Sequence, residues 1–318
     1  MNITVIGCGR WGSFLAWYAA KLGHAVTIYG RENSTHFLKL QETGTNGLVS
    51  FGPETKMTTD LPKAVASAQM VIISIGAQGL RGLMAQLQPL SFSGKTMVLC
   101  MKGIEASTGL RLTQIVREFL PDIDLGIWVG PGHVQDFVKG LPNCMVVDSD
   151  REEVKARIID AMGSDLIRFY YGDDLLGNEI GAASKNVIGI AAGILDGKNK
   201  TSLKGPLMCR GTREIARLIK AMGGNELTAY GLSHLGDYEA TVFSKYSHNR
   251  QFGESFVKKE PYGELAEGAA TVKALLLLGK KYQVELPICD AVDRIIHQNQ
   301  DADACINRLF TRSLKHEF

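Results

Sequence analysis

Residues 3–12 of the chain read ITVIGCGRWG. The β-branched run Ile3–Ile6 leads directly into the pattern G-x-G-x-x-G, and residues with helical spacing follow it. In such a loop Gly7 permits a tight turn, Gly9 lets phosphates approach the backbone, and Gly12 lets the helix pack close to the strand. The N-terminus of that helix presents N–H groups and a positive partial charge to an anion. The stretch therefore predicts the dinucleotide-binding loop of a βαβ unit, with a glycine-rich turn that holds no ligand as the alternative.

The first half of the chain alternates between short apolar runs and longer segments with helical spacing. We expect strands at Ile3–Ile6, Ala25–Tyr29, Met70–Ile75, Met97–Met101, Asp124–Val129, Cys144–Val147 and Leu166–Tyr170. We expect helices at Trp11–Gly23, Leu80–Gln88, Leu110–Phe119 and Glu152–Met162. This alternation is typical of βαβ units, so it predicts an α/β Rossmann-like domain over residues 1–173, with a doubly wound, mainly parallel sheet.

The pattern changes near residue 173. Beyond it no segment reads clearly as a strand, and helical spacing recurs in Glu179–Leu195, Thr212–Met222, Ala266–Lys281 and Ile288–Gln298. These segments predict an all-α domain over residues 174–318. The least regular stretch is Gly231–Gly263, and loops of that length are often functional.

Composition excludes several classes of protein. The 318 residues include 35 basic and 33 acidic ones, a formal charge of +2, which gives no reason to expect a nucleic-acid partner. No apolar run approaches about 18 residues, so we expect no membrane span, and the N-terminus reads as a strand rather than a signal peptide. The six cysteines form no CxxC pair, so we expect neither a metal site nor a disulfide framework, and a cytoplasmic location.

The second predicted strand ends at Tyr29, close to where a bound adenosine ribose would lie. An acidic residue there binds the 2′-hydroxyl of NAD, whereas a nearby arginine accommodates the 2′-phosphate of NADP. This chain reads Gly30-Arg31-Glu32. Arg31 would bind a 2′-phosphate or stack on adenine. The acidic Glu32 beside it complicates that assignment. The alternative is that Arg31 is a solvated surface residue. The sequence therefore leaves the choice between NAD and NADP open.

Two lysines are candidates for chemistry. Lys102 follows the strand Met97–Met101, at the end of a parallel strand where ligands bind. Lys185 lies in a small-residue helix with Gly181 and Gly189 one turn away on either side. A glycine inside a helix costs about 1 kcal/mol relative to alanine, which indicates a packing or binding reason. A lysine desolvated in such a notch has a lowered pKa and suits proton exchange. The alternatives are a surface role for Lys102, and glycines that only permit tight packing while Lys185 reaches solvent.

With these features combined, the sequence resembles the NAD(P)-dependent glycerol-3-phosphate dehydrogenases over nearly its whole length. The segments that carry the resemblance follow the family's order: Gly7–Gly12, Lys102–Glu105, Gly130-Pro131, Gly140–Pro142, Lys185–Gly193, Arg210-Gly211, Gly231-Leu232 with Gly236-Asp237, Asn249-Arg250 with Gly253, and Glu267-Gly268. Most are weakly specific alone, and their order and spacing together are specific.

The resemblance implies reversible reduction of dihydroxyacetone phosphate to sn-glycerol 3-phosphate, with NAD or NADP as cofactor and a homodimer as a plausible assembly. It implies that Lys185 exchanges the C2-oxygen proton, that Lys102 stabilises the developing alkoxide, and that Asp237 completes the catalytic set. It assigns to the small phosphorylated three-carbon substrate the residues Lys102, Gly130, Gly132, Asp237, Thr241, Ser247, His248 and Asn249. It assigns to the cofactor the residues Gly7, Gly9, Arg10, Trp11, Gly12, Arg31, Lys102, Val134, His248 and Glu267.

Two positions depart from the family pattern, and both concern the substrate. His248 replaces an arginine that serves the phosphate and the cofactor, and histidine is shorter and only partly charged near neutral pH. Arg250 compensates only if it points the same way. Gly132 replaces a serine or threonine and so lacks a hydroxyl. These departures leave two alternatives: a dehydrogenase of another small ketone or hydroxy acid, and a dinucleotide-binding protein without turnover.

Overall fold

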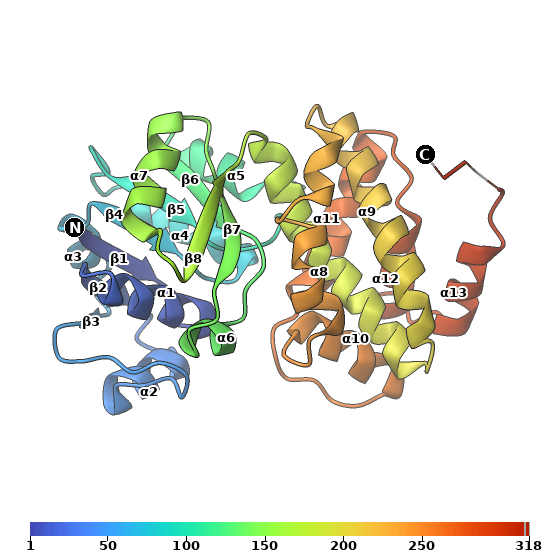
Figure 1. The fold of residues 1–318 in the computed structure, drawn as a ribbon, viewed down its shortest axis with the longest axis horizontal. Helices are drawn as coiled ribbons and strands as arrows, with labels where there is room; N and C mark the ends of the chain where they lie inside the picture. The colour runs from blue at the N-terminus through green and yellow to red at the C-terminus, as the bar shows by residue number, and fades with distance from the viewer. Residues whose placement is uncertain (315, 318) are drawn as a thin grey trace. The chain divides into compact units, whose positions relative to one another are not determined.

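A computed structural model of the chain describes residues 1–314, 316 and 317. The chain forms two compact units (Figure 1). The first unit contains Met1–Lys102 and Arg111–Glu179, and the second contains Gly103–Leu110 and the residues from Ile180 onward. The two domains expected at 1–173 and 174–318 remain a prediction, because the compact units interleave along the chain.

The first unit is built on one eight-stranded sheet. Its strands are β1 (Asn2–Ile6), β2 (Ala25–Tyr29), β3 (Lys56–Thr58), β4 (Met70–Ile73), β5 (Thr96–Leu99), β6 (Asp124–Val129), β7 (Asn143–Asp148) and β8 (Ile167–Tyr171). Their order across the sheet is β3-β2-β1-β4-β5-β6-β7-β8, and only the β6–β7 pairing is antiparallel. The mainly parallel, doubly wound sheet expected from the sequence is therefore confirmed. Because the chain leaves β1 toward β2 on one side and continues from β4 toward β5 on the other, the order reverses at β1 and β4, where ligands of such sheets bind.

The central strands are buried along nearly their whole length, which explains why they read as unbroken apolar runs. All four residues of β4 are buried, and Ile3 of β1 lies in register with Val26 of β2 and Met70 of β4. The sequence prediction missed β3, since this edge strand has only three residues and none of them is fully buried.

Seven helices connect and cover the described strands of the first unit. They are α1 (Arg10–Lys21), α2 (Thr35–Thr43), α3 (Leu61–Ala66), α4 (Leu80–Leu87), α5 (Leu112–Phe119), α6 (Val134–Val138) and α7 (Glu152–Met162). An aromatic cluster beside the glycine loop joins α1 to α6: the Phe14 and Phe137 rings stack with centroids 5.1 Å apart, and Trp11 lies 6.2 Å from Phe137.

The second unit is helical, and no strand occurs in its described residues. Its longer helices are α8 (Leu175–Gly197, which starts in the first unit), α9 (Lys204–Ala221), α10 (His248–Lys258), α11 (Glu267–Lys281), α12 (Pro287–Ile296) and α13 (Ala302–Phe310). Three short helical segments lie between α9 and α10: η3 (Glu226–Tyr230), η4 (Leu235–Asp237) and the π-helical turn η5 (Glu239–Phe243).

Helix α8 presents a glycine face to its neighbours. A Cβ atom at Gly193 would lie 1.9 Å from the carbonyl oxygen of Arg250, and one at Gly253 of α10 would lie 2.2 Å from that of Ile190. Helices α8 and α10 therefore approach so closely that only glycine fits at both positions. The two glycines that flank Lys185 are packed as well, Gly181 against His234 and Gly189 against Thr241, so tight packing, one of the two alternatives for this segment, does occur.

The irregular stretch expected over Gly231–Gly263 is the clearest difference from the sequence prediction. It contains η4, η5 and the eleven-residue helix α10. Only Gly253 of α10 is fully buried, so the helix gives a weak apolar pattern in the sequence.

Candidate active site

Lys185 is held by two acceptors inside the second unit. The residue is only 8% exposed, which excludes the alternative in which Lys185 reaches solvent. Its Nζ lies 2.8 Å from Oδ2 of Asp237 and donates a hydrogen bond to Oγ1 of Thr241 at 2.7 Å. Both acceptors are almost completely buried. A cation, an anion and a hydroxyl thus form one buried polar cluster, which we call the lysine cluster.

The turn between η4 and η5 brings the two acceptors together. Asp237 ends η4, and Thr241 lies in the middle of η5. The carbonyl oxygen of Tyr238 accepts from the backbone nitrogens of Thr241 and Val242, at 3.1 and 2.6 Å. The segment is helical, so Thr241 lies one helical turn beyond Asp237. Single π-helical turns occur frequently at functional sites.

The start of α10 lies against the same face of α8. A Cβ atom at Gly189, one turn after Lys185, would lie 2.7 Å from Cγ2 of Thr241 and 3.3 Å from Cβ of Asn249. Oδ1 of Asn249 accepts from the backbone nitrogen of Gly268 at 2.9 Å, so its NH2 group is the end that can donate to an anion. Ser247 is the N-cap of α10, and its Oγ accepts from the backbone nitrogen of Arg250.

His248 occupies the first position of α10. Its Nδ1 is hydrogen-bonded to the hydroxyl of Tyr262 at 2.8 Å, and that hydroxyl donates to Oε1 of Gln251 at 3.3 Å. Sequence reasoning did not identify Tyr262, which lies fourteen residues further along the chain with no motif around it.

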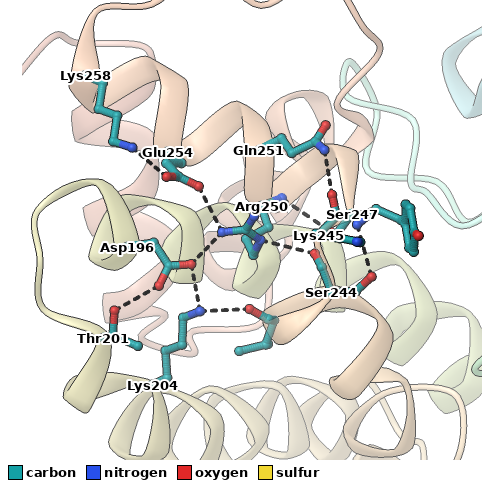
Figure 2. Close-up of polar contacts among 12 residues, drawn as sticks. Asp196, Thr201, Lys204, Ser244, Lys245, Ser247, Arg250, Gln251, Glu254 and Lys258 are labelled. Atoms are coloured by element: carbon teal, nitrogen blue, oxygen red, sulfur yellow. Dashed lines mark hydrogen bonds and ion pairs between the residues drawn. The ribbon is translucent and has the colours of Figure 1, made fainter.

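Arg250 does not point toward this group. Figure 2 shows its guanidinium between the carboxylates of Asp196 and Glu254, with Nη1 at 2.7 and 2.9 Å from their oxygens. Its Nε donates to the carbonyl oxygen of Ser244, and Lys204 completes the network with an ion pair of 2.7 Å to Asp196. Arg250 therefore fastens α10 to α8, and it does not replace the arginine missing at position 248.

Glu267 begins α11, and Gly268 beside it packs on the α8 backbone, since a Cβ there would lie 2.6 Å from the carbonyl oxygen of Asn186. The second unit thus brings Lys185 together with Asp237 and Thr241, and packs Asn249 beside Gly189, one turn further along α8.

In the first unit the three glycines of the loop have distinct surroundings. Gly7 has φ +111°, and a Cβ atom there would overlap the carbonyl oxygen of Ser74, which follows β4. A Cβ at Gly12 would overlap the carbonyl oxygen of Gly7, whereas no atom lies within 4 Å of the position a Cβ would take at Gly9. The loop is therefore closed on its inner side and open at Gly9, at the N-terminus of α1. This geometry fits a dinucleotide pyrophosphate.

The turn after β2 has no room for an acidic side chain at its first position. A Cβ atom at Gly30 would lie 2.2 Å from the fully buried ring of Phe37. Arg31 follows and is exposed. Ser34, the N-cap of α2, lies with its Oγ 3.9 Å from the sulfur of Cys8 in the glycine loop. A cation and a hydroxyl thus flank this turn, and Glu32 is also exposed there.

Lys102 and Gly130 meet at the carboxyl ends of β5 and β6. Nζ of Lys102 donates to the carbonyl oxygen of Gly130 at 2.7 Å. Gly130 has φ +126°, a conformation that favours glycine.

The departure at Gly132 has a packing cause. A Cβ atom there would lie 2.4 Å from the ring of Phe137, which is 1% exposed and stacked on Phe14. A serine or threonine at 132 would require this aromatic cluster to move. Val134 is buried in the same core, and Trp11 packs against that core. Arg10 is exposed at the start of α1.

Among the described residues, no three His, Cys, Asp or Glu side chains are grouped so as to hold a metal ion. No helix within residues 1–314 is long and apolar enough to cross a bilayer.

Comparison with known proteins gives one consistent result. The profile of the NAD-dependent glycerol-3-phosphate dehydrogenase N-terminus matches residues 2–155, and that of its C-terminus matches residues 174–307. A glycerol-3-phosphate dehydrogenase (NAD(P)+) of Bradyrhizobium sp. (strain ORS 278) is 36% identical, over 99% of this chain and 98% of its own. The enzyme of the same name from Parvibaculum lavamentivorans is 34% identical over the same shares.

Solved structures agree. The crystal structure of glycerol-3-phosphate dehydrogenase from Coxiella burnetii superposes with a TM-score of 0.92, at 26% identity over 98% of this chain and 99% of that one. The structure of DsGPDH of Dunaliella salina shares the fold, with a TM-score of 0.86 at 19% identity, over 96% of this chain and 60% of that one. The whole-length identity to these relatives shows that the chain belongs to the NAD(P)-dependent glycerol-3-phosphate dehydrogenase family.

Proposed function

We propose that this protein catalyses the reversible NAD(P)H-dependent reduction of dihydroxyacetone phosphate to sn-glycerol 3-phosphate, with Lys185 as the proton-exchanging group. Membership in the family supports the reaction. The buried lysine cluster carries the assignment of Lys185, because a buried ammonium with two fixed acceptors is oriented for proton transfer.

The glycine loop fits the cofactor. Gly9 and the N-terminus of α1 would hold the pyrophosphate, and Arg31 with Ser34 would lie beside the adenosine ribose. When bound, the dinucleotide supplies or accepts the hydride of the reaction.

Lys185 would hold and deliver the proton. Reduction of the C2 ketone needs a proton on its oxygen as hydride arrives at its carbon, and a lysine ammonium supplies one. Asp237 orients that ammonium through the ion pair, and Thr241 fixes its second hydrogen-bond direction. In the reverse direction the neutral amine would take the proton from the C2 hydroxyl.

Lys102 would act electrostatically. Its bond to the Gly130 carbonyl oxygen fixes the ammonium at the carboxyl end of β5, where a positive charge stabilises a developing alkoxide.

The N-terminus of α10 would bind the substrate phosphate. The first-turn N–H groups of a helix lack intrahelical partners, and His248 and Asn249 add a ring and an amide donor. Because Arg250 is bound by two carboxylates, His248 is the group that substitutes for the missing arginine.

We also infer a reducing compartment such as the cytoplasm and a homodimeric assembly. The six cysteines are unpaired, which supports the former, and the resemblance suggests the latter. Analytical ultracentrifugation of the purified chain tests the dimer.

The deciding experiment measures oxidation of NADH and NADPH with dihydroxyacetone phosphate, and with unphosphorylated dihydroxyacetone as the control. Turnover that depends on the phosphate supports the proposal. Cofactor binding without turnover on dihydroxyacetone phosphate, but with turnover on another small ketone, would replace the substrate. Binding with no turnover on any ketone would leave a dinucleotide-binding protein.

A further inference from the structure

His234 connects α8 to the segment that carries Asp237. The residue is fully buried. Its Nδ1 lies 2.8 Å from the carbonyl oxygen of Gly181, one helical turn before Lys185, and its Nε2 lies 2.7 Å from the hydroxyl of Tyr238. A Cβ atom at Gly181 would lie 3.1 Å from Cβ of His234, so the imidazole sits directly on the helix backbone.

These two partners fix the tautomer of the ring. The carbonyl oxygen of Gly181 can only accept, so Nδ1 carries the hydrogen. In the neutral ring Nε2 is then an acceptor, and the Tyr238 hydroxyl donates to it. Burial lowers the pKa of His234 to about 4, which agrees with a neutral imidazole near neutral pH.

In the sequence, Tyr238 lies between Asp237 and Thr241, the two acceptors of Lys185. It follows Asp237 directly, and its carbonyl oxygen accepts from the backbone nitrogen of Thr241. Its ring is fully buried against α9, where a Cβ atom at Gly211 would lie 3.4 Å from the hydroxyl. A shift of Tyr238 would therefore move Asp237 and Thr241 together.

We propose that His234 and Tyr238 form a neutral hydrogen-bonded brace that sets the position of Asp237 and Thr241 relative to Lys185. Both are positioning residues, because the hydrogen bonds of the imidazole go to the Gly181 carbonyl oxygen and to the Tyr238 hydroxyl. The brace ties the backbone of α8, one turn before the lysine, to the residue between its acceptors. Proton transfer is steep in distance, so a shift of about 1 Å in such a group can reduce turnover by about a hundredfold.

The role of the brace in turnover rests on the proposed function, whereas its effect on Lys185 does not. The test variant is Tyr238→Phe, which deletes one hydroxyl and leaves no large cavity. We expect kcat with dihydroxyacetone phosphate to fall about tenfold or more while the Kd of the cofactor stays within about twofold. We also expect the titration of Lys185, followed by 13Cε NMR and assigned with Lys185→Arg, to shift.

Tyr18→Phe is the matched control. Tyr18 is also buried, and its hydroxyl bonds to the Met162 carbonyl oxygen and to Ser164 in the first unit. This variant should lose stability without changing kcat or the Lys185 titration. His234→Asn keeps a donor for Gly181 and removes the acceptor for Tyr238, so the double variant with Tyr238→Phe should lose no more than either single one.

The outcomes separate the two proposals. If the wild type does not turn over dihydroxyacetone phosphate, the proposed function fails, and the Lys185 titration alone decides the brace. An unchanged titration in Tyr238→Phe overturns the brace. So do additive losses in the double variant, or equal effects from Tyr18→Phe.

Discussion

Lys185 and Asp237 each depend on the other for charge balance. The ion pair is 2.8 Å long, and the two side chains are 9% and 1% exposed. Removing one partner of such a buried pair leaves an uncompensated charge and typically costs about 3–5 kcal/mol. A single substitution at Lys185 therefore mixes a loss of stability with a loss of chemistry, and the test must separate them.

We predict that Lys185→Met lowers both turnover and stability, whereas Lys185→Met with Asp237→Asn recovers most of the stability and none of the turnover. The double variant has no unpaired buried carboxylate, but it has no proton donor either. We expect kcat to fall about 10²- to 10⁴-fold in both, with the Kd of the cofactor unchanged. Urea unfolding and steady-state kinetics measure the two effects.

Lys155 provides the control for losing a buried lysine. It lies in α7, its side chain is 3% exposed, and its Nζ donates to the carbonyl oxygen of Gly172 at 2.8 Å. Lys155→Met should destabilise the protein at unchanged kcat. If Lys185→Met kept near-wild-type turnover, Lys185 would not be the proton-exchanging group.

Much of the fold could be predicted because its strands are buried on both faces. Strands β2 and β6 and helix α7 occupy the predicted residues, and the other predicted strands are shifted only at their ends. Two of the elements that the sequence prediction missed have a weak apolar signal: β3 is a short edge strand, and α10 is fixed by glycine contacts and by the ion pairs of Arg250. Those interactions join residues far apart in the sequence, and no local pattern encodes them.

The site could be predicted from the sequence where a motif itself needs a particular backbone conformation. The glycine loop is of this kind, because the φ of +111° at Gly7 and the contact of Gly12 with the Gly7 carbonyl oxygen arise within the loop itself. The partners of His248 and Arg250 were not predictable, since the side-chain directions at the start of α10 depend on Asp196 and Tyr262. From the sequence, Gly132 is interpreted as the loss of a hydroxyl. In the structure, the absence of a side chain at Gly132 leaves space for the buried ring of Phe137.

His248→Arg should lower the KM for dihydroxyacetone phosphate by about tenfold, because an arginine forms charge-assisted, bidentate hydrogen bonds with a phosphate. Unphosphorylated dihydroxyacetone is the control, and its KM should not change. A KM for the phosphorylated substrate that stays constant or rises would show that residue 248 does not face the phosphate.

We expect Arg31→Ala to raise the KM for NADPH about tenfold more than that for NADH, since loss of one charge-assisted hydrogen bond to a 2′-phosphate costs about 1.5 kcal/mol. Gly30 cannot carry a competing carboxylate, because Phe37 fills the space. Glu32→Gln is the matched control at the neighbouring exposed position, and it should favour NADPH slightly by removing a negative charge. Equal changes for both cofactors in Arg31→Ala would exclude a contact with the 2′-phosphate.

Glu214 makes the stability of the helical unit depend on pH. Its carboxylate lies 1% exposed in α9 and accepts from the backbone nitrogens of Ile288 and Cys289, at 2.9 and 3.0 Å, at the start of α12. Burial raises the pKa of this carboxyl from 4.5 to about 7. The folded state therefore binds more protons than the unfolded state between these values, so this group's contribution to stability is full below pH 4.5 and is lost as the pH rises to about 7.

The shift corresponds to a loss on the order of 3 kcal/mol across that window. Glu214→Gln removes the titration and also costs one helix-capping hydrogen bond at every pH. We therefore expect the variant to be clearly less stable than the wild type at pH 5 and closer to it, or more stable, at pH 8, as measured by urea unfolding at both values. A difference between the two proteins that does not change with pH would mean that Glu214 stays ionised throughout, held by the two N–H groups of α12.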